Sequence, residues 1–168
     1  WPFDTDPLYA TTVTSQTPGA DTAALLDGSE VSPYGRFGYG VKFDKTDSKS
    51  RMRHNSNGVD IQPNSWTLSV WAKDLVPPLS SGRSTLFRGQ GKQSNRDWDR
   101  YLVVRGSNRL LHSYDGADGN ANNRYRSTGQ EINPVSLRGW HHFVVVGTGN
   151  RTRFFLDGAF AGEADRQE

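Results

Sequence analysis

The chain has 168 residues and a formal net charge of +2, with 20 Lys and Arg residues against 18 Asp and Glu residues. This near balance gives no general basic surface of the kind that nucleic-acid-binding domains need, and the absence of cysteine excludes a disulfide scaffold, thiolate zinc sites and cysteine nucleophiles. Only 33% of the residues are hydrophobic, but 11% are aromatic and 18 are glycine, a composition that favours short strands joined by turns over a helical bundle or a disordered chain.

The first half of the chain contains one strongly periodic segment. Thr22–Leu26 is the nearest approach to a helix and is too short for one, and Gly40–Asp44 is typical of a short strand. Trp66–Lys73 alternates apolar and polar residues along its whole length, which predicts a half-buried strand. Trp71 interrupts the polar face of this strand, where it either packs under a loop or meets a ligand.

The second half of the chain contains five more short runs bounded by Gly, Asn or Asp: Ser84–Arg88, Tyr101–Arg105, Arg109–Tyr114, His141–Val146 and Thr152–Leu156. Gly147–Asn150 and Asp157-Gly158 provide residues that tolerate the positive φ of tight hairpins. This spacing predicts an all-β antiparallel sandwich or barrel, in one domain over residues 1–168. Gln90–Arg100 and Asp115–Arg126 are long, polar and predicted to be loops, which commonly carry binding residues.

A resemblance is carried by six segments in this order: Trp1-Pro2-Phe3-Asp4, Gly40-Val41-Lys42-Phe43-Asp44, Trp66-Thr67-Leu68-Ser69-Val70-Trp71, Leu86-Phe87-Arg88-Gly89, Gly139-Trp140-His141-His142-Phe143 and Phe155-Leu156-Asp157-Gly158. Nearly end to end, the chain resembles a laminin G-like domain of the concanavalin A-like lectin and glucanase superfamily. The resemblance implies an all-β, antiparallel two-sheet jelly-roll sandwich, often calcium-binding, that occurs in extracellular adhesion and sugar-recognition modules.

Similar domains continue after the Asp-Gly hairpin with a Gly-rich strand and a closing strand, whereas this sequence stops at Glu168. We therefore expect the last strands to be missing, either because the chain is a fragment of a larger extracellular or cell-surface protein or because a neighbouring subunit or domain completes the open sheet edge. The sequence has no apolar run of about 18 residues, so we expect no membrane insertion.

Two clusters are candidate calcium sites, because calcium binds oxygen ligands from flexible loops rich in Asp, Asn and Gly. The first consists of Asp115, Asp118 and Asn120, and the second of Asp44 and Asp47. Neither cluster has EF-hand spacing. The alternative is that these side chains cap the backbone of their own turns.

The candidate glycan-binding residues lie in or beside the two polar segments. Sugar recognition combines an aromatic face for the pyranose ring with planar polar groups for its hydroxyls, and the residues that offer this combination are Trp98, Arg100, Asn120, Arg124 and Tyr125. The alternative is that both aromatic rings fold back onto the sheet. Arg51, Arg53 and His54 form the densest basic patch of the sequence. This patch would suit an acidic or sulfated glycan, although isolated surface charges are the commoner case.

Catalysis is not expected. Glycoside cleavage needs two carboxylates flanking the bond, and none of the four glutamates is paired with another carboxylate at strand spacing. Asp97 and Asp99 have that spacing but lie in a polar segment. His141 and His142 would face opposite sides of one strand, so they cannot jointly hold a metal from it, and the resemblance makes them structural.

The sequence therefore predicts a non-enzymatic extracellular module that binds a glycan or glycoprotein through one rim of loops, with calcium as the candidate cofactor. The alternative is a structural or adhesive domain that mediates protein contacts within a matrix or filament. Nucleic acid is not an expected partner, because basic residues alternate with Asp and no helix is available to enter a groove.

Overall fold

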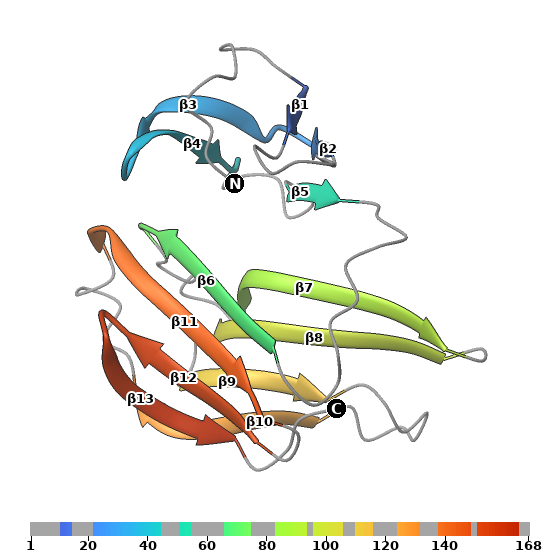
Figure 1. Cartoon of the computed structure of the whole chain (residues 1–168), viewed down its shortest axis with the longest axis vertical. Helices are drawn as coiled ribbons and strands as arrows, with labels where there is room; N and C mark the ends of the chain where they lie inside the picture. Colours follow the sequence, from blue (N-terminus) through green and yellow to red (C-terminus); the bar gives the residue numbers. More distant parts are fainter. Residues whose placement is uncertain are drawn as a thin grey trace. The chain divides into compact units, whose positions relative to one another are not determined.

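The structure is a computed structural model of the whole chain, in which residues 11–14, 22–44, 51–54, 66–74, 83–93, 96–105, 110–115, 124–131, 138–148 and 151–164 are described. These residues form thirteen strands. Their bounds are β1 (Thr12–Thr14), β2 (Thr22–Leu26), β3 (Glu30–Gly35), β4 (Gly38–Lys42), β5 (Arg51–His54), β6 (Trp66–Ala72), β7 (Arg83–Gln93), β8 (Arg96–Arg105), β9 (Leu110–Asp115), β10 (Arg124–Glu131), β11 (His141–Gly147), β12 (Thr152–Leu156) and β13 (Ala159–Ala164). Figure 1 shows them along the chain.

The chain divides into two compact units, Trp1–Asp60 and Ile61–Glu168, and each is described by itself. The single domain over residues 1–168 stays a prediction, because compact units of this size can belong to one domain or to two. The described residues include no helix that is long and apolar enough to cross a membrane.

The N-terminal unit contains a three-stranded sheet in the order β1-β2-β5 and a β3–β4 hairpin, all antiparallel. Its buried cluster consists of Val13, Ala23, Leu25 and Val31. Thr22–Leu26, which the sequence analysis placed nearest to a helix, is the central strand of this sheet. The apolar residues Ala23 and Leu25 are two apart and share the buried face, a spacing that suits a strand and not a helix.

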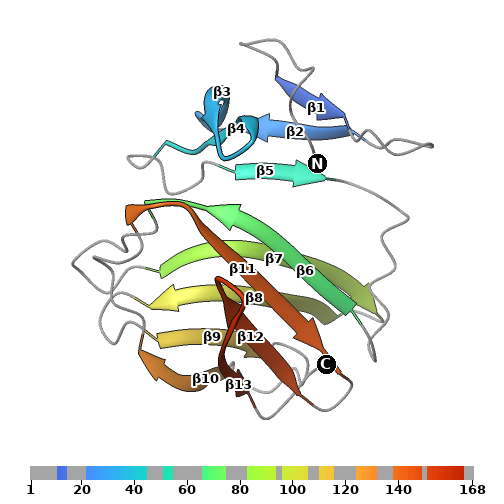
Figure 2. The same cartoon turned by 60° about the vertical axis from the view of Figure 1, so that its left-hand side comes forward.

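The C-terminal unit consists of two antiparallel four-stranded sheets, ordered β10-β9-β8-β7 and β13-β12-β11-β6. Among the residues whose burial the structure describes, Phe143, Val145, Phe154 and Ala161 of the second sheet form a buried cluster. Leu86 of β7 packs against this cluster, so the first sheet covers the inner face of the second, as Figure 2 shows. The prediction of an all-β antiparallel two-sheet sandwich is confirmed.

The second sheet has an inner and an outer face that follow directly from the alternation in the sequence. Along β11, Phe143, Val145 and Gly147 are buried, whereas the residues between them are half-buried. β6 pairs with β11 along its whole length and alternates half-buried with exposed residues. This confirms the strand predicted over Trp66–Lys73, with Trp71 on the outer face.

Asp157-Gly158 forms the predicted hairpin turn between β12 and β13. Both residues have positive φ, 51° and 82°, as the turns that match the twist of a two-residue hairpin require. The strand after the turn, β13, was not assigned from the sequence. It contains a bulge, because Phe154 pairs with Gly162 while the next residue, Phe155, pairs with Phe160.

Candidate functional site

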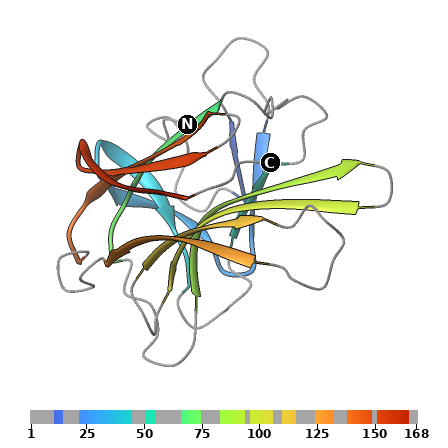
Figure 3. The same cartoon turned by 90° about the horizontal axis from the view of Figure 1, so that it is seen from below.

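The segment Gln90–Arg100 is not the long loop that the sequence predicts. It forms most of the outer part of the β7–β8 hairpin, in which Gln93 pairs with Arg96 next to the turn. Among the described residues, β8 pairs with β9 at Leu102–Val104, and the β7–β8 hairpin continues past this stretch (Figure 3). The sequence of this segment has no alternation of apolar and polar residues, which is why the strand was missed.

Trp98 and Arg100 lie on the same face of β8, since they are two residues apart on one strand. Their partners on β7 are Gly91 and Gly89. Directly opposed residues of an antiparallel pair are each other's nearest side-chain neighbours, and a glycine contributes no side chain there. Trp98 and Arg100 are therefore neighbours on one strand, and each is paired with a glycine of β7.

The segment Asp115–Arg126 was predicted to be a loop, but its two ends belong to β9 and β10, and residues 116–123 lie outside the described residues. Arg124 pairs with Asp115, and Tyr125 pairs with Tyr114. A candidate glycan contact, Arg124, and a candidate calcium ligand, Asp115, thus form one cross-strand pair.

Of the other candidate calcium ligands, the structure describes Asp44 alone. Asp118, Asn120 and Asp47 lie outside the described residues. Asp44 follows β4, and its Cβ lies 3.1 Å from the position of a Cβ added to Gly28. Within the described ranges, no group of three or more His, Asp or Glu side chains could hold a metal ion. The calcium site stays a prediction.

The best-defined polar cluster of the C-terminal unit surrounds Asp157. Its Oδ2 lies 2.7 Å from Nδ1 of His141, and its Oδ1 accepts a hydrogen bond of 2.9 Å from the backbone N–H of His142. The Asp157 N–H donates to the carbonyl of His142 at 2.9 Å. One residue of the β12–β13 turn therefore anchors the first two residues of β11.

The electrostatics of Asp157 follow from these contacts. Burial of the carboxyl raises its pKa, but the hydrogen bonds from the His142 backbone N–H and the His141 ring, together with the charges of the two imidazoles, outweigh that effect. The net result is that the pKa of Asp157 lies below its ordinary value. The carboxylate is the form that the cluster stabilises.

The two histidines face opposite sides of β11, as the sequence predicts. Nε2 of His142 lies 2.8 Å from Oγ of Ser69, and its ring stacks on Trp71 with centroids 4.9 Å apart and an interplanar angle of 12°. Both histidines are thus held by neighbouring side chains, which confirms the structural interpretation. Trp71 remains 36% exposed, and so this indole is supported by His142 and still accessible to solvent.

The outer face of the second sheet is a feature that sequence reasoning missed. Phe155 of β12 and Phe160 of β13 lie on it as a cross-strand pair, with ring centroids 5.8 Å apart and Phe160 60% exposed. Beside them, Arg153 pairs with Glu163. The signal was available in Arg153-Phe154-Phe155-Leu156, where three consecutive apolar residues cannot all face one core from a strand.

A model of the concanavalin A-like lectin/glucanases superfamily, in its laminin G-like branch, matches residues 44–168. The chain belongs to this superfamily. The match covers all of β6 to β13 and confirms the resemblance that the sequence motifs indicate. No match to the chain was found among curated proteins or among solved structures.

Membership makes this laminin G-like chain a module of a class that binds carbohydrates or proteins. Laminin G-like domains are typically extracellular and generally non-catalytic. The superfamily also includes glucanases, whose chemistry needs two carboxylates facing one sugar bond. In the β7–β8 hairpin, Asp97 pairs with Lys92 and Asp99 pairs with Gln90, so neither carboxylate has another carboxylate as its cross-strand partner.

Proposed function

We propose that this laminin G-like chain is a non-catalytic extracellular module that binds a glycan, free or on a glycoprotein, at the rim formed by the β7–β8 hairpin and the β9–β10 strand ends. The glycan-contacting residues would be Trp98, Arg100, Asn120, Arg124 and Tyr125. The observation that supports this function most directly is the register of β8, which sets Trp98 and Arg100 on one face opposite two glycines.

The physical basis is the fit between this pair and a pyranose. An indole offers a flat apolar surface to the C–H face of the ring, and a guanidinium offers several N–H donors in a fixed plane to hydroxyl or carboxylate oxygens. The β7 partners of this pair, Gly89 and Gly91, have no side chains. Calcium, held by Asp115, Asp118 and Asn120 or by Asp44 and Asp47, would add a further set of oxygen ligands for sugar hydroxyls.

A glycan array probed with the purified chain, in calcium and after chelation with EDTA, tests this function. We expect binding to one glycan class, and we expect Trp98→Ala to weaken it about tenfold, in line with the loss of one aromatic stacking contact. Trp71→Ala is the matched control, because it removes an accessible indole from the other sheet. The proposal is wrong if no glycan binds in either condition, or if Trp98→Ala binds as well as the unmodified chain.

The second candidate function is protein binding, the structural or adhesive role that the sequence analysis left open. A specific observation favours it, namely the exposed Phe160 on the outer face of the β13-β12-β11-β6 sheet. Isolated exposed apolar residues are ordinary on protein surfaces, but this ring continues into a half-buried Phe155 and Val144 on neighbouring strands. An apolar stretch of this kind is typical of a contact surface for another protein.

A further inference from the structure

One end of the outer sheet face combines positive charge with exposed aromatic surface. Phe154 is buried in the core at 1% exposure, so its neighbours on β12, Arg153 and Phe155, lie on the outer face. Each has a direct partner on β13: Arg153 pairs with Glu163, and Phe155 pairs with Phe160. A charged cross-strand pair and an aromatic cross-strand pair are therefore neighbours on the same two strands.

The bulge in β13 creates this arrangement. Phe160 is exposed and Ala161 is buried, so strict alternation would turn Glu163 toward the core. The bulge adds one residue at Ala161–Gly162, and Gly162 adopts a φ of 117°. A bulge shifts the alternation by one position and can re-aim a side chain, and here it returns Glu163 to the outer face beside Arg153.

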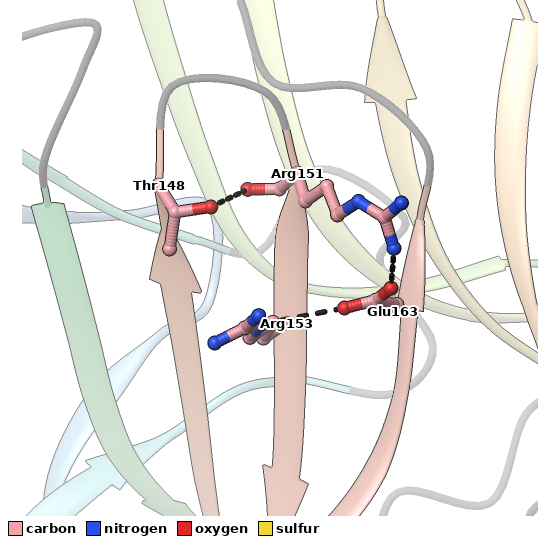
Figure 4. Close-up of polar contacts among 4 residues, drawn as sticks. All are labelled: Thr148, Arg151, Arg153 and Glu163. Atoms are coloured by element: carbon pink, nitrogen blue, oxygen red, sulfur yellow. Dashed lines mark hydrogen bonds and ion pairs between the residues drawn. The ribbon is translucent and has the colours of Figure 1, made fainter.

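Two guanidinium groups share the one carboxylate of Glu163. Nη1 of Arg151 donates to Oε1, and Nε of Arg153 donates to Oε2 at 3.3 Å. Figure 4 shows the two arginines reaching Glu163 from different directions. Among the described residues, Glu163 is the one carboxylate paired with these two positive charges, and each guanidinium has five N–H donors of which it engages one. Both arginine side chains remain about half exposed, at 53% and 51%.

The aromatic pair lies directly beside the two arginines. The rings of Phe155 and Phe160 meet edge to face at an interplanar angle of 69°, and Val144 of β11 pairs with Phe155 and extends the apolar surface to a third strand. These three side chains have no hydrogen-bonding group. A sugar needs several polar groups to read its hydroxyls, whereas a peptide can bury apolar side chains here and direct a carboxylate to the arginines.

We propose that Arg151 and Arg153, with Phe155, Phe160 and Val144, form a docking site for an acidic, apolar peptide segment of a partner protein. We call these five residues the Arg–Phe site. A carboxylate of the partner accepts from the arginine N–H groups that Glu163 leaves unused, and the adjacent apolar side chain packs on Phe160. This inference rests on the protein-binding alternative, and it is independent of glycan binding at Trp98.

The test is a titration of the ¹⁵N-labelled chain with a short peptide in which Glu alternates with Leu, followed by NMR. We expect shifts of the Arg153 Nε–H signal and of β12 and β13 amides, with saturation at high peptide concentration. Arg153→Gln and Phe160→Ser are each expected to weaken binding about tenfold, through loss of a charge-assisted pair and of apolar contact respectively. Both side chains are exposed, so the variants are expected to keep the fold, which the amide spectrum verifies.

Two matched controls separate this site from general electrostatics. Lys42→Gln removes an exposed cation from the N-terminal unit and is expected to leave peptide binding unchanged. A peptide with Gln in place of Glu is expected to bind about tenfold more weakly, because it offers no carboxylate to the arginines. Raising the salt concentration is expected to weaken the Glu peptide more than the Gln peptide.

Glu163→Gln provides the sharpest outcome, because it removes the competing carboxylate while leaving the shape of the site. We expect the Glu–Leu peptide to bind about threefold more tightly, since the site then has two uncompensated positive charges. The proposal is overturned if Glu163→Gln weakens binding, if Arg153→Gln leaves it unchanged, or if an acidic oligosaccharide shifts the same signals and the peptide does not. None of these outcomes bears on the Trp98 variants, so the two functions fail separately.

Discussion

Substitution of Asp157 tests whether one turn residue anchors the start of β11. Asp157→Ala removes the acceptor for the His142 backbone N–H at 2.9 Å and the partner of the His141 ring at 2.7 Å. Since the Asp157 side chain is 49% exposed, each contact is counted at the low end, about 0.5–1 kcal/mol. Alanine at a φ of 51° costs about 1 kcal/mol more than aspartate, which tolerates this conformation. The free energy of unfolding is expected to fall by about 2–3 kcal/mol.

For a chain of this size, that loss corresponds to a fall in Tm of about 5–10 °C, measured by circular dichroism or calorimetry at neutral pH. Asp157→Asn keeps an acceptor oxygen and tolerates the same φ, so it is expected to lower Tm by only about 2–4 °C. The matched control is Asp27→Ala. Asp27 opens another Asp-Gly turn with a φ of 54°, but its carboxylate pairs with the exposed Arg51 and anchors no histidine.

The pH dependence has a definite sign. The folded pKa of Asp157 is lowered, so its ionised form contributes stability that is present above its unfolded pKa of about 3.9 and is lost as the pH falls through the folded pKa. The Tm difference between the unmodified chain and Asp157→Asn should therefore shrink below about pH 4. Equal Tm values for the unmodified chain and Asp157→Ala at neutral pH would refute the reasoning.

Three further predictions concern the core, the bulge and the metal. Phe154→Ala is expected to lower the free energy of unfolding by about 3–5 kcal/mol, whereas Phe160→Ala, at 60% exposure, should change it by less than about 0.5 kcal/mol in chemical denaturation. Gly162→Ala, at a φ of 117°, is expected to cost about 1–3 kcal/mol and to disturb the amide signals of Glu163 and Arg153. If a calcium site binds tightly, EDTA will lower Tm by several degrees and Asp118→Ala will abolish that difference; an unchanged melt counts against structural calcium.

The sequence was most informative where a strand faces a core. In Trp66–Ala72 the alternation of residues maps directly onto the exposure of the strand, because packing forces one face to be apolar. Thr22–Leu26 was rejected as a helix but was not assigned as a strand, because five residues carry too little periodicity to identify one until the partner strands are known. The family motifs were decisive for the fold, and the match over residues 44–168 covers four of the six segments in full.

The sequence was least informative where register decides the outcome. That Trp98 lies opposite Gly91, and Arg124 opposite Asp115, depends on which residues of two strands pair, and a shift of one residue would exchange the faces. The Arg–Phe site depends in addition on a bulge that no alternation in Ala159–Ala164 signals. The residues of each candidate site are visible in the sequence, but their neighbours are a property of the sheet.

The two proposed surfaces lie on different sheets, which has a consequence for their coupling. The glycan rim belongs to the β10-β9-β8-β7 sheet and the Arg–Phe site to the β13-β12-β11-β6 sheet. Between the sheets, Leu86 packs against the core cluster that includes Phe143 and Phe154. Well-packed cores move little, and changes at distant sites that share no partner add independently. We therefore expect Phe160→Ser to leave glycan affinity unchanged and Trp98→Ala to leave peptide affinity unchanged. If each variant instead weakened both ligands, the two surfaces would form one site, and the assignment of separate ligands to separate sheets would be wrong.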